Sequence, residues 1–326
     1  MTHVIGVDLG GTKTAAGVVS SSGEVLLSDT IPTLNRAGGE AILDATATLV
    51  TGLVERAADA GLTVSGVGVG SAGVIDAVAG SVVSATDAIR GWAGTALVSG
   101  LSARLGLGVR AVNDVHAHAL GEAWLGAAAG STSSLMVAFG TGVGGSFVLD
   151  GAPLLGHRFV GGHMGHFASP YAVFAGGPLA CVCGSSGHVE AIASGPAIHH
   201  SFLRFGGSGS AAADTREVFG LASGTPAKAH DAGAAAASAD DVAAACRAVE
   251  LGATAAGQAV GGLINILDPE TVVISGGLAD AGDLWWKPME AALREELLAP
   301  LVAVPVVRAT LGNTAAIVGA AKLILS

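Results

Sequence analysis

The chain has 326 residues, of which 51% are hydrophobic and 13% charged, which allows about two domains with large cores and excludes a disordered protein. Its net charge of −11 argues against a nucleic acid or an anionic membrane as partner. Three cysteines form no disulfide framework, and no signal-type or membrane-spanning run is found. We therefore predict a cytoplasmic protein with no nucleic-acid and no membrane partner.

Short apolar runs separated by polar turns open the chain and predict three antiparallel strands, over 4–8, 14–19 and 25–28. Apolar residues then recur at helical spacing, and further short apolar runs end at glycines or polar residues. The elements predicted from these patterns are helices over 40–61, 97–105 and 114–125 and strands over 64–69 and 109–112.

The pattern restarts at residue 135, because a strand, a glycine turn and a second strand over 135–149 resemble the opening of the chain. A second half built like the first is therefore expected. The remaining predicted elements are helices over 189–202, 243–267 and 314–325 and a strand over 271–275. Residues 205–240 are rich in Gly, Ala and Ser and are expected to form helices with mobile joints.

The turn Asp8-Leu9-Gly10-Gly11-Thr12-Lys13-Thr14 carries the first chemical signal. Glycines permit a close backbone approach, and consecutive N–H groups can hold phosphate oxygens. Thr12 adds a hydroxyl, and Asp8 is suited to hold a metal ion through water. A polar hairpin turn is the alternative. The spacing is not that of a P-loop, so we predict a phosphate-binding hairpin of another kind.

Two further stretches, 68–73 and 140–145, match Gly-x-Gly-x-x-Gly. A dinucleotide fingerprint must follow a strand and open a helix, whereas both stretches lead into strand-like sequence. We therefore reject the dinucleotide interpretation and predict a second phosphate-binding hairpin around Thr141 and Gly142. The pair Gly276-Gly277 follows a predicted strand and gives a weak signal for a surface on which adenine lies.

Asn113-Asp114 stands at the end of a predicted strand. A carboxylate there can accept a hydroxyl proton while the neighbouring amide positions a sugar, although Asn or Asp at this point also serves as a helix N-cap. Both interpretations can hold together. His116 and His118 are expected on the helix surface rather than as ligands.

Cysteine and histidine cluster between residues 163 and 190. His166, Cys181, Cys183 and His188 make a four-ligand set of the type that holds zinc tetrahedrally with no open position. We predict a structural zinc ion there, and a metal-free loop tied by hydrogen bonds is the alternative.

These pieces together resemble the ROK family of repressors, open reading frames and sugar kinases. The resemblance spans nearly the whole chain and rests on Asp8–Lys13, Asn113-Asp114, Thr141–Gly145, Gly162–His166, Cys181–Glu190 and Gly276-Gly277. It implies an α/β protein of two actin/hexokinase-like (ribonuclease H-like) domains, each with a mixed five-stranded sheet, and an interdomain active-site cleft. The smaller domain would be 1–112 completed by the helix over 314–326, and the larger one 113–313.

The resemblance also implies roles for individual residues. Asp114 would be the catalytic base. ATP and Mg²⁺ would be bound by Asp8, Gly10, Gly11, Thr12, Lys13, Thr141, Gly142, Gly276 and Gly277. The sugar would be bound by Gly73, Asp87, Asn113, Asp114, His163, His166 and Glu190. Trp92 is expected to pack in the core rather than stack on the sugar.

Two departures from the family pattern matter. His163 stands where members usually have Glu, at the position that contacts the sugar near C1 and C2, and Gly-His-x-Gly-His resembles the bacterial N-acetylmannosamine kinases of the family. His188 replaces the third cysteine of the usual zinc motif, and imidazole remains a good zinc ligand.

The function expected from the resemblance is ATP-dependent phosphorylation of the 6-hydroxyl of N-acetylmannosamine. A glucokinase or N-acetylglucosamine kinase is the alternative within the class. A non-catalytic sugar sensor is the alternative from another class, and a repressor is disfavoured because the chain starts at the first phosphate-loop strand. Relatives are commonly dimers or tetramers, so a homodimer or homotetramer is expected.

Overall fold

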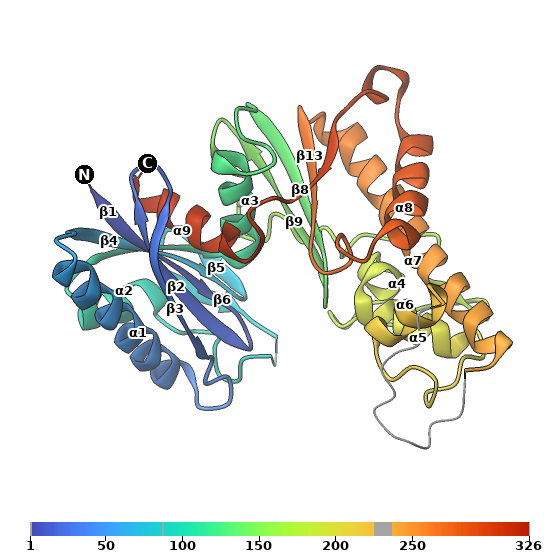
Figure 1. Ribbon diagram of the computed structural model, residues 1–326, viewed down its shortest axis with the longest axis horizontal. Helices are drawn as coiled ribbons and strands as arrows, with labels where there is room; N and C mark the ends of the chain where they lie inside the picture. The colour runs from blue at the N-terminus through green and yellow to red at the C-terminus, as the bar shows by residue number, and fades with distance from the viewer. Residues whose placement is uncertain (1, 87, 225–236, 326) are drawn as a thin grey trace. The chain divides into compact units, whose positions relative to one another are not determined.

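The computed structural model describes residues 2–86, 88–224 and 237–325 (Figure 1). The chain divides into two compact units. The first unit comprises Met1–Ser134, Ser146–Gly162 and Ala309–Ser326, and the second comprises Leu135–Gly145 and His163–Arg308. The first unit thus includes residues 113–134, 146–162 and 309–313, which the division drawn from the sequence assigned to the larger domain. That division stays a prediction.

The first unit is built on a mixed sheet of five strands. They are β1 (His3–Leu9), β2 (Lys13–Ser20), β3 (Val25–Pro32), β4 (Val64–Ser71) and β7 (Gly108–Asn113), in the order β3-β2-β1-β4-β7. β2 pairs antiparallel with both β1 and β3, whereas β4 pairs parallel with both β1 and β7. The carboxyl ends of β1, β4 and β7 therefore lie at one edge of this sheet.

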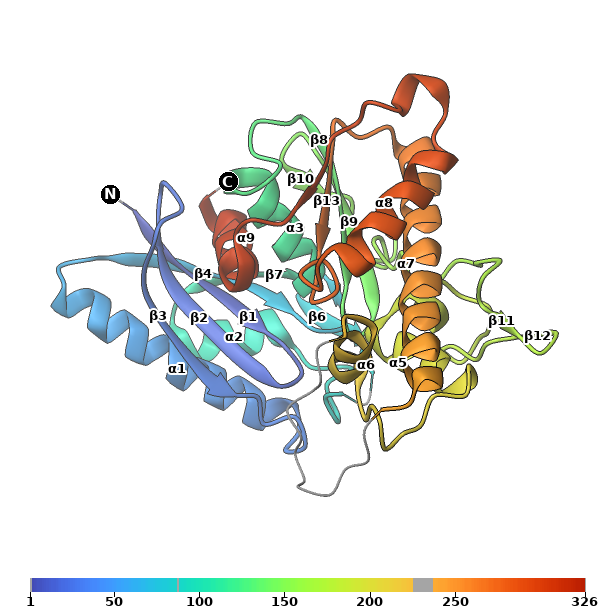
Figure 2. The same cartoon turned by 45° about the vertical axis from the view of Figure 1, so that its right-hand side comes forward.

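Helices cover both faces of the first sheet (Figure 2). The apolar residues of α1 (Gly39–Asp59) and α2 (Leu97–Leu105) form one core with alternate residues of β1 and β4. On the other face, Ile317 and Ala321 of α9 (Ala315–Leu325) pack against Val4 and Val19. α9 also packs closely against α3 (Asp114–Leu125).

Two glycines let α9 lie directly on the strands. A Cβ at Gly6 of β1 would collide with the backbone carbonyl of Ile317, and one at Gly68 of β4 would collide with that of Ala320. Much of the small-residue content of the sequence therefore serves close packing, in addition to turns.

A second five-stranded sheet has the order β10-β9-β8-β13-β14. Its strands are β8 (Ser133–Phe139), β9 (Val143–Leu149), β10 (Ala152–Pro153), β13 (Thr271–Ser275) and β14 (Val306–Arg308). It is mixed too, because β9 pairs antiparallel with β10 while β13 pairs parallel with β14. Two small hairpins complete the strands: β5 (Val74–Asp76) with β6 (Ser81–Ser84), and β11 (Val173–Phe174) with β12 (Gly177–Pro178).

The helices of the second unit follow the predicted Cys/His metal ligands in the chain. They are α4 (Glu190–Ala193), α5 (Gly195–Arg204), α6 (Thr215–Ala222), α7 (Ala239–Leu267) and α8 (Asp283–Glu296). Single 3₁₀ turns lie at Ala299–Leu301 and, in the first unit, at Gly312–Thr314. α7 packs along α8, and its first turn is closed by a capping box between Ser238 and Asp241.

The predicted fold class is confirmed, including the repeated strand–turn–strand unit and the mixed five-stranded sheets. The helix predicted over 189–202 is wrong in its continuity. Ser194 is extended and caps the second piece, and Pro196 follows at its start, so α4 and α5 are separate. α8 was not predicted. Among the described residues, no helix is long and apolar enough to cross a membrane.

Candidate active site

The predicted sugar and phosphate residues of the first unit meet at the carboxyl ends of its parallel strands. Asp8 of β1 lies opposite Gly70 of β4, and the next residue of β4, Ser71, lies opposite Asn113 of β7. Parallel strands end on the same side of a sheet, which is where α/β proteins bind their ligands. Register therefore places Asp8, Asn113 and Asp114 at one edge.

The predicted phosphate turn, Gly10–Lys13, joins β1 to β2, and residues that follow β3 hold it by hydrogen bonds. The Gly10 N–H donates to the Lys13 carbonyl at 3.0 Å. The Thr33 hydroxyl donates to the Gly10 carbonyl, and the Asn35 amide donates to the Gly11 carbonyl, each at 2.8 Å. These hydrogen bonds engage the carbonyls of Gly10, Gly11 and Lys13 and so brace the turn.

Asp8 is the electrostatic centre of this edge. Burial is the main cause that raises the pKa of its carboxyl, from 3.8 to about 6, and the neighbouring Asp114 carboxylate raises it further. The Lys13 ammonium acts in the opposite direction. A carboxylate that is costly to ionise beside a second carboxylate is well suited to a cation, since the cation offsets both charges.

Asn113 and Asp114 open helix α3. The Asn113 amide donates to the Gly73 carbonyl at 2.8 Å, and its oxygen accepts from the Val115 N–H at 2.9 Å as the N-cap. One Asp114 oxygen accepts from the same N–H at 2.9 Å. The capping interpretation of Asn113 is thus confirmed, and Gly73, Asn113 and Asp114 lie together.

The structure also tests what was expected of His116 and Trp92. His116 was expected on the helix surface, but this is wrong: it is buried, and its Nε2 lies 2.9 Å from the Gly161 carbonyl. Trp92 is fully buried and its Nε1 donates to the Ala72 carbonyl at 3.0 Å, which confirms its packing role. Asp87 lies outside the described residues.

In the second unit, the turn after β8 is locked by Glu190. The buried Glu190 carboxylate accepts from the Val143 N–H at 2.7 Å. A Cβ at Gly142 would lie 2.6 Å from the same carboxylate oxygen, so a side chain there would displace the carboxylate from the Val143 N–H. Glu190, which the resemblance assigned to the sugar, thus holds the backbone of the predicted second phosphate turn.

A cavity of about 620 Å³ opens beside this turn. Its wall combines the predicted Thr141 and Gly277 with residues of α5, α6 and the segment after β13. The lining is Gly140, Thr141, Gly195, Pro196, Asp214, Thr215, Arg216, Phe219, Gly277, Leu278 and Ala281. Gly276, at φ +85°, packs against the Phe139 backbone and lets the chain turn into this wall. A volume of this size accommodates a nucleotide.

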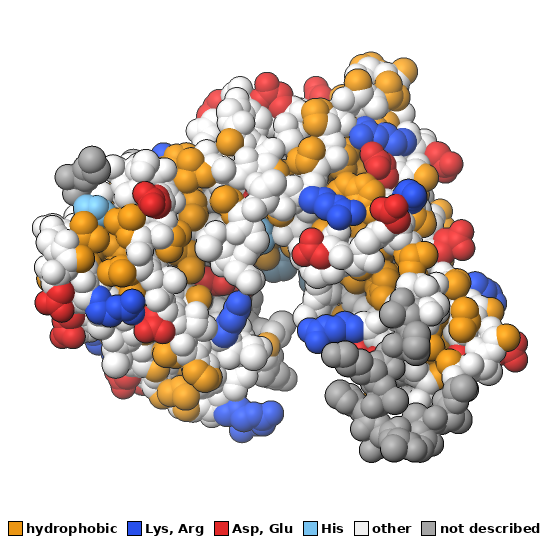
Figure 3. All heavy atoms as spheres, viewed as in Figure 1, with side chains coloured by type: hydrophobic (Ala, Val, Ile, Leu, Met, Phe, Trp, Pro, Cys, Tyr) orange, Lys and Arg blue, Asp and Glu red, His pale blue; other side chains and the backbone are white. Residues whose placement is uncertain are grey.

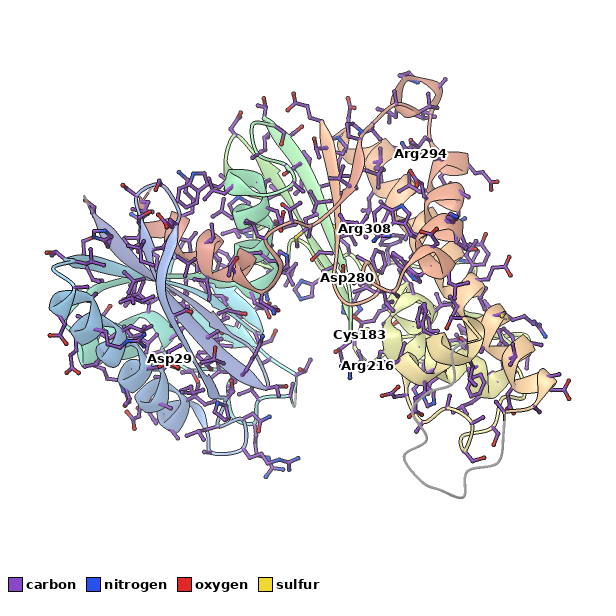
Figure 4. All side chains as sticks on the ribbon, viewed as in Figure 1. Asp29, Cys183, Arg216, Asp280, Arg294 and Arg308 are labelled. Atoms are coloured by element: carbon purple, nitrogen blue, oxygen red, sulfur yellow. The ribbon has the colours of Figure 1, made fainter. Side chains whose placement is uncertain are left out.

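Sequence reasoning missed the contribution of α6, including Arg216, which is labelled in Figure 4. The segment was interpreted only as Gly-, Ala- and Ser-rich. A local signal was present: Asp214 accepts from the Glu217 N–H at 3.0 Å, and Glu217 accepts from the Ala213 N–H. Asp-x-x-Glu is a capping pattern that marks the start of a helix.

The four predicted zinc ligands come together in the second unit. The candidate ligand atoms of His166, Cys181, Cys183 and His188 all lie within 4.8 Å of one another. Cys181 Sγ is 3.6 Å from His166 Nδ1, and Cys183 Sγ is 3.3 Å from His188 Nδ1. Burial is the main cause that raises the pKa of the Cys181 thiol.

These distances suit zinc. Bonds of about 2.3 Å to sulfur and about 2.0–2.1 Å to nitrogen, at tetrahedral angles, separate S and N by about 3.6 Å. The loop is shaped for it by tight turns, in which the Cys181 N–H donates to Ser185 and the Gly184 N–H to Cys181, with Gly184 at φ +88°. The donor set of two thiols and two imidazoles fits a structural site.

His163 is exposed and lies three residues before His166, the first of the four candidate metal ligands. Its carbonyl accepts from the His166 N–H at 3.1 Å, and the two rings are 6.0 Å apart. The Glu190 N–H donates to the Gly165 carbonyl at 2.9 Å. A metal ion on His166 would therefore brace the backbone that carries both His163 and Glu190.

Comparison with known proteins agrees with this arrangement. The ROK family model matches residues 4–326. The glucokinase of Thermotoga maritima is 35% identical over 98% of this chain and 96% of its own length. Among solved structures, the ROK hexokinase of Thermus thermophilus is 34% identical, with a TM-score of 0.80 and coverage of 98% of this chain and 96% of that one. The glucokinase of Streptomyces griseus, solved with glucose and AMPPNP, is 28% identical, with a TM-score of 0.76 and coverage of 98% of both chains.

The chain therefore belongs to the ROK family. Its relatives and its two actin/hexokinase-like sheets define it as an ATP-dependent sugar kinase.

Proposed function

We propose that this kinase transfers the γ-phosphoryl group of ATP to the 6-hydroxyl of N-acetylmannosamine. The observation that carries the choice of sugar is His163, an exposed histidine at the position where the family usually places the glutamate that contacts the sugar near C1 and C2. A carboxylate only accepts hydrogen bonds, whereas a neutral imidazole has one donor and one acceptor nitrogen. N-acetylmannosamine and N-acetylglucosamine differ at C2, so the replacement falls where the two are distinguished.

In the proposed mechanism, Asp114 accepts the proton of the 6-hydroxyl as its oxygen attacks the γ-phosphorus. Asn113, Gly73, His163, His166 and Glu190 would hold the sugar so that this oxygen faces the phosphoryl group. Asp87, in the segment that precedes Trp92, is proposed to contact a sugar hydroxyl. Positioning of this kind supplies much of the rate enhancement in phosphoryl transfer.

The N–H groups of Gly10, Gly11, Thr12, Thr141 and Gly142 are proposed to donate to the phosphates of ATP, with Lys13 as a further positive charge. Gly276 and Gly277 would lie against the adenosine. Mg²⁺, when bound near Asp8, would neutralise the charge that develops on the phosphoryl oxygens. Burial raises the pKa of the Asp8 carboxyl, so a cation nearby would stabilise its ionised form, which supports this role.

We also propose a structural zinc ion held by His166, Cys181, Cys183 and His188. The support is the tetrahedral spacing of the two S–N pairs. Zinc would take no part in the reaction. Its role would be to fix the loop that carries His163 and the start of α4, and so to shape the sugar site.

Glucose is a second candidate substrate, favoured by the 35% identity to the Thermotoga maritima glucokinase. Free cysteines suit a reducing compartment, so a cytoplasmic location remains our proposal. A homodimer or homotetramer stays a prediction.

The substitution His163→Glu tests the proposal, because it restores the residue that the family usually has. We expect kcat/KM for N-acetylmannosamine to fall about tenfold or more and that for glucose or N-acetylglucosamine to rise. The matched control is His157→Glu, which places the same change on another exposed histidine of the neighbouring loop. If His163→Glu leaves the ratio of the sugars as it is in the wild type and in the control, His163 does not select the sugar.

A further inference from the structure

A second cavity, of about 490 Å³ and with a polar lining, lies in the first unit. It is lined by Asn35, Arg36, Ala88 and Arg90. Both arginine side chains are exposed. The backbone N–H of Arg90 donates to the backbone carbonyl of Asn35 at 2.8 Å and joins the two sides of the cavity. We call it the arginine pocket.

The arginine pocket adjoins the phosphate turn. The Asn35 side chain donates to the Gly11 carbonyl at 2.8 Å. A Cβ built on Gly11 would lie 3.5 Å from the Ala88 Cβ, so the opposite wall reaches the same glycine. Two walls of the pocket therefore touch the turn that is proposed to bind the phosphates of the reaction.

Several other cations of the described chain are engaged by carboxylates or by aromatic rings. Four of them form ion pairs with carboxylates: Arg56, Arg104, Lys287 and Arg294. Four lie over aromatic rings: Arg204, Arg247, Arg308 and Lys322. Within the described residues, Arg36 and Arg90 form no such ion pair or ring contact, as is also true of Arg158 and Arg216, and they differ from these in lining one cavity together. Positive side chains are also sparse and scattered on the face in Figure 3.

A guanidinium group presents five N–H donors in a planar fork that matches two oxygens of a phosphate. The chain as a whole has a net charge of −11 and repels anions. Two guanidinium groups on one cavity make the potential at this place positive. The polar lining offers no large apolar surface, so a compact, highly charged group suits the pocket better than a ring.

We propose that the arginine pocket binds a phosphate group of a ligand that also occupies the phosphate turn. Two sources carry this chemistry. One is the far end of a phosphoryl donor whose chain of phosphates is longer than that of ATP. The other is the phosphate of the sugar phosphate product, held on its way out. The site extends the proposed function, but its test needs no turnover.

The test is isothermal titration calorimetry at fixed ionic strength with two probes, inorganic tripolyphosphate and N-acetylmannosamine 6-phosphate. The variants are Arg36→Gln and Arg90→Gln, which leave the backbone contacts of the pocket intact. Arg158→Gln is the matched control, because Arg158 is exposed, lies in the same unit and does not line the pocket. It removes one positive charge and so accounts for the long-range effect of charge on binding.

We expect each pocket variant to raise the Kd of one probe about tenfold, which corresponds to about 1.4 kcal/mol, while the control stays within about twofold of the wild type. The probe that loses affinity identifies the source of the phosphate. The proposal is overturned if the wild type binds neither probe, or if Arg36→Gln and Arg90→Gln change both Kd values no more than Arg158→Gln does. Failure of the wild type to phosphorylate N-acetylmannosamine, with the affinity losses of the pocket variants present, would instead count against the proposed function and leave the pocket in place.

Discussion

The buried carboxyl of Asp8 makes a prediction about stability that is independent of catalysis. Burial and the nearby Asp114 raise its pKa from 3.8 to about 6. The folded protein therefore binds this proton more tightly than the unfolded chain does. Consequently the free energy of unfolding falls as the pH rises from about 4 to about 6 and stays at the lower value above that. Asn at this position carries no charge and suffers no such loss.

The size of the effect follows from the two pKa values. The rise of the pKa from 3.8 to about 6 corresponds to a loss of about 3 kcal/mol in the free energy of unfolding at pH 8. This is an upper figure, because water and nearby dipoles reduce the cost of ionising the carboxyl. At pH 5 the same two pKa values give about 1.6 kcal/mol. We therefore expect Asp8→Asn to stabilise the metal-free protein, by about 1.4 kcal/mol more at pH 8 than at pH 5.

Urea unfolding at both pH values, without metal or nucleotide, measures this difference. Asp150→Asn is the control, because Asp150 is exposed and its φ of 50° suits Asn as well as Asp. The reasoning is refuted if the advantage of Asp8→Asn is the same at pH 5 and pH 8, or if the substitution destabilises the protein at pH 8. Added Mg²⁺ should reduce the advantage, since a cation offsets the charge of the wild-type carboxylate.

Three further outcomes are expected. Asp114→Asn should lower kcat by orders of magnitude while calorimetric sugar binding survives, because only proton acceptance is lost, and a near-normal kcat would remove Asp114 from the role of base. Gly142→Ala should cost about 1–3 kcal/mol of stability by displacing the Glu190 carboxylate, whereas Gly140→Ala, whose Cβ meets nothing within 4 Å, should cost little; equal losses in urea unfolding would contradict this. Purified protein should contain about one zinc per chain by elemental analysis, and Cys183→Ser should lose most of it; a metal-free wild type would disprove the zinc site.

The parts of the site that the sequence predicted are those written in short local motifs. Asn113 and Asp114 follow an apolar strand directly, so the edge on which they lie follows from the strand itself. The cluster of Cys181, Cys183 and His188 was predictable too, because the three residues lie within eight positions of one another in a glycine-containing turn. In each case the chemistry and the backbone geometry are set by neighbours in the chain.

The parts that were missed depend on distant contacts. His116 is buried because the Gly161 carbonyl, 45 residues away, reaches its ring. Arg216 enters the wall of the cavity beside Thr141 and Gly277 only because α6 packs next to the turns that carry those two residues. The arginine pocket joins residues 35–36 to 88–90, and no local pattern connects them. Hydrophobic periodicity reports which face of an element is buried, but not which remote segment covers it.

The central claim is that the chain phosphorylates N-acetylmannosamine, and steady-state kinetics with MgATP test it most directly. The comparison is kcat/KM for N-acetylmannosamine, N-acetylglucosamine and glucose, measured with the wild-type protein. The account predicts a preference of about tenfold or more for N-acetylmannosamine, which corresponds to about 1.4 kcal/mol of transition-state discrimination. A preference for glucose or N-acetylglucosamine would contradict the assignment of His163 and leave a kinase of another sugar.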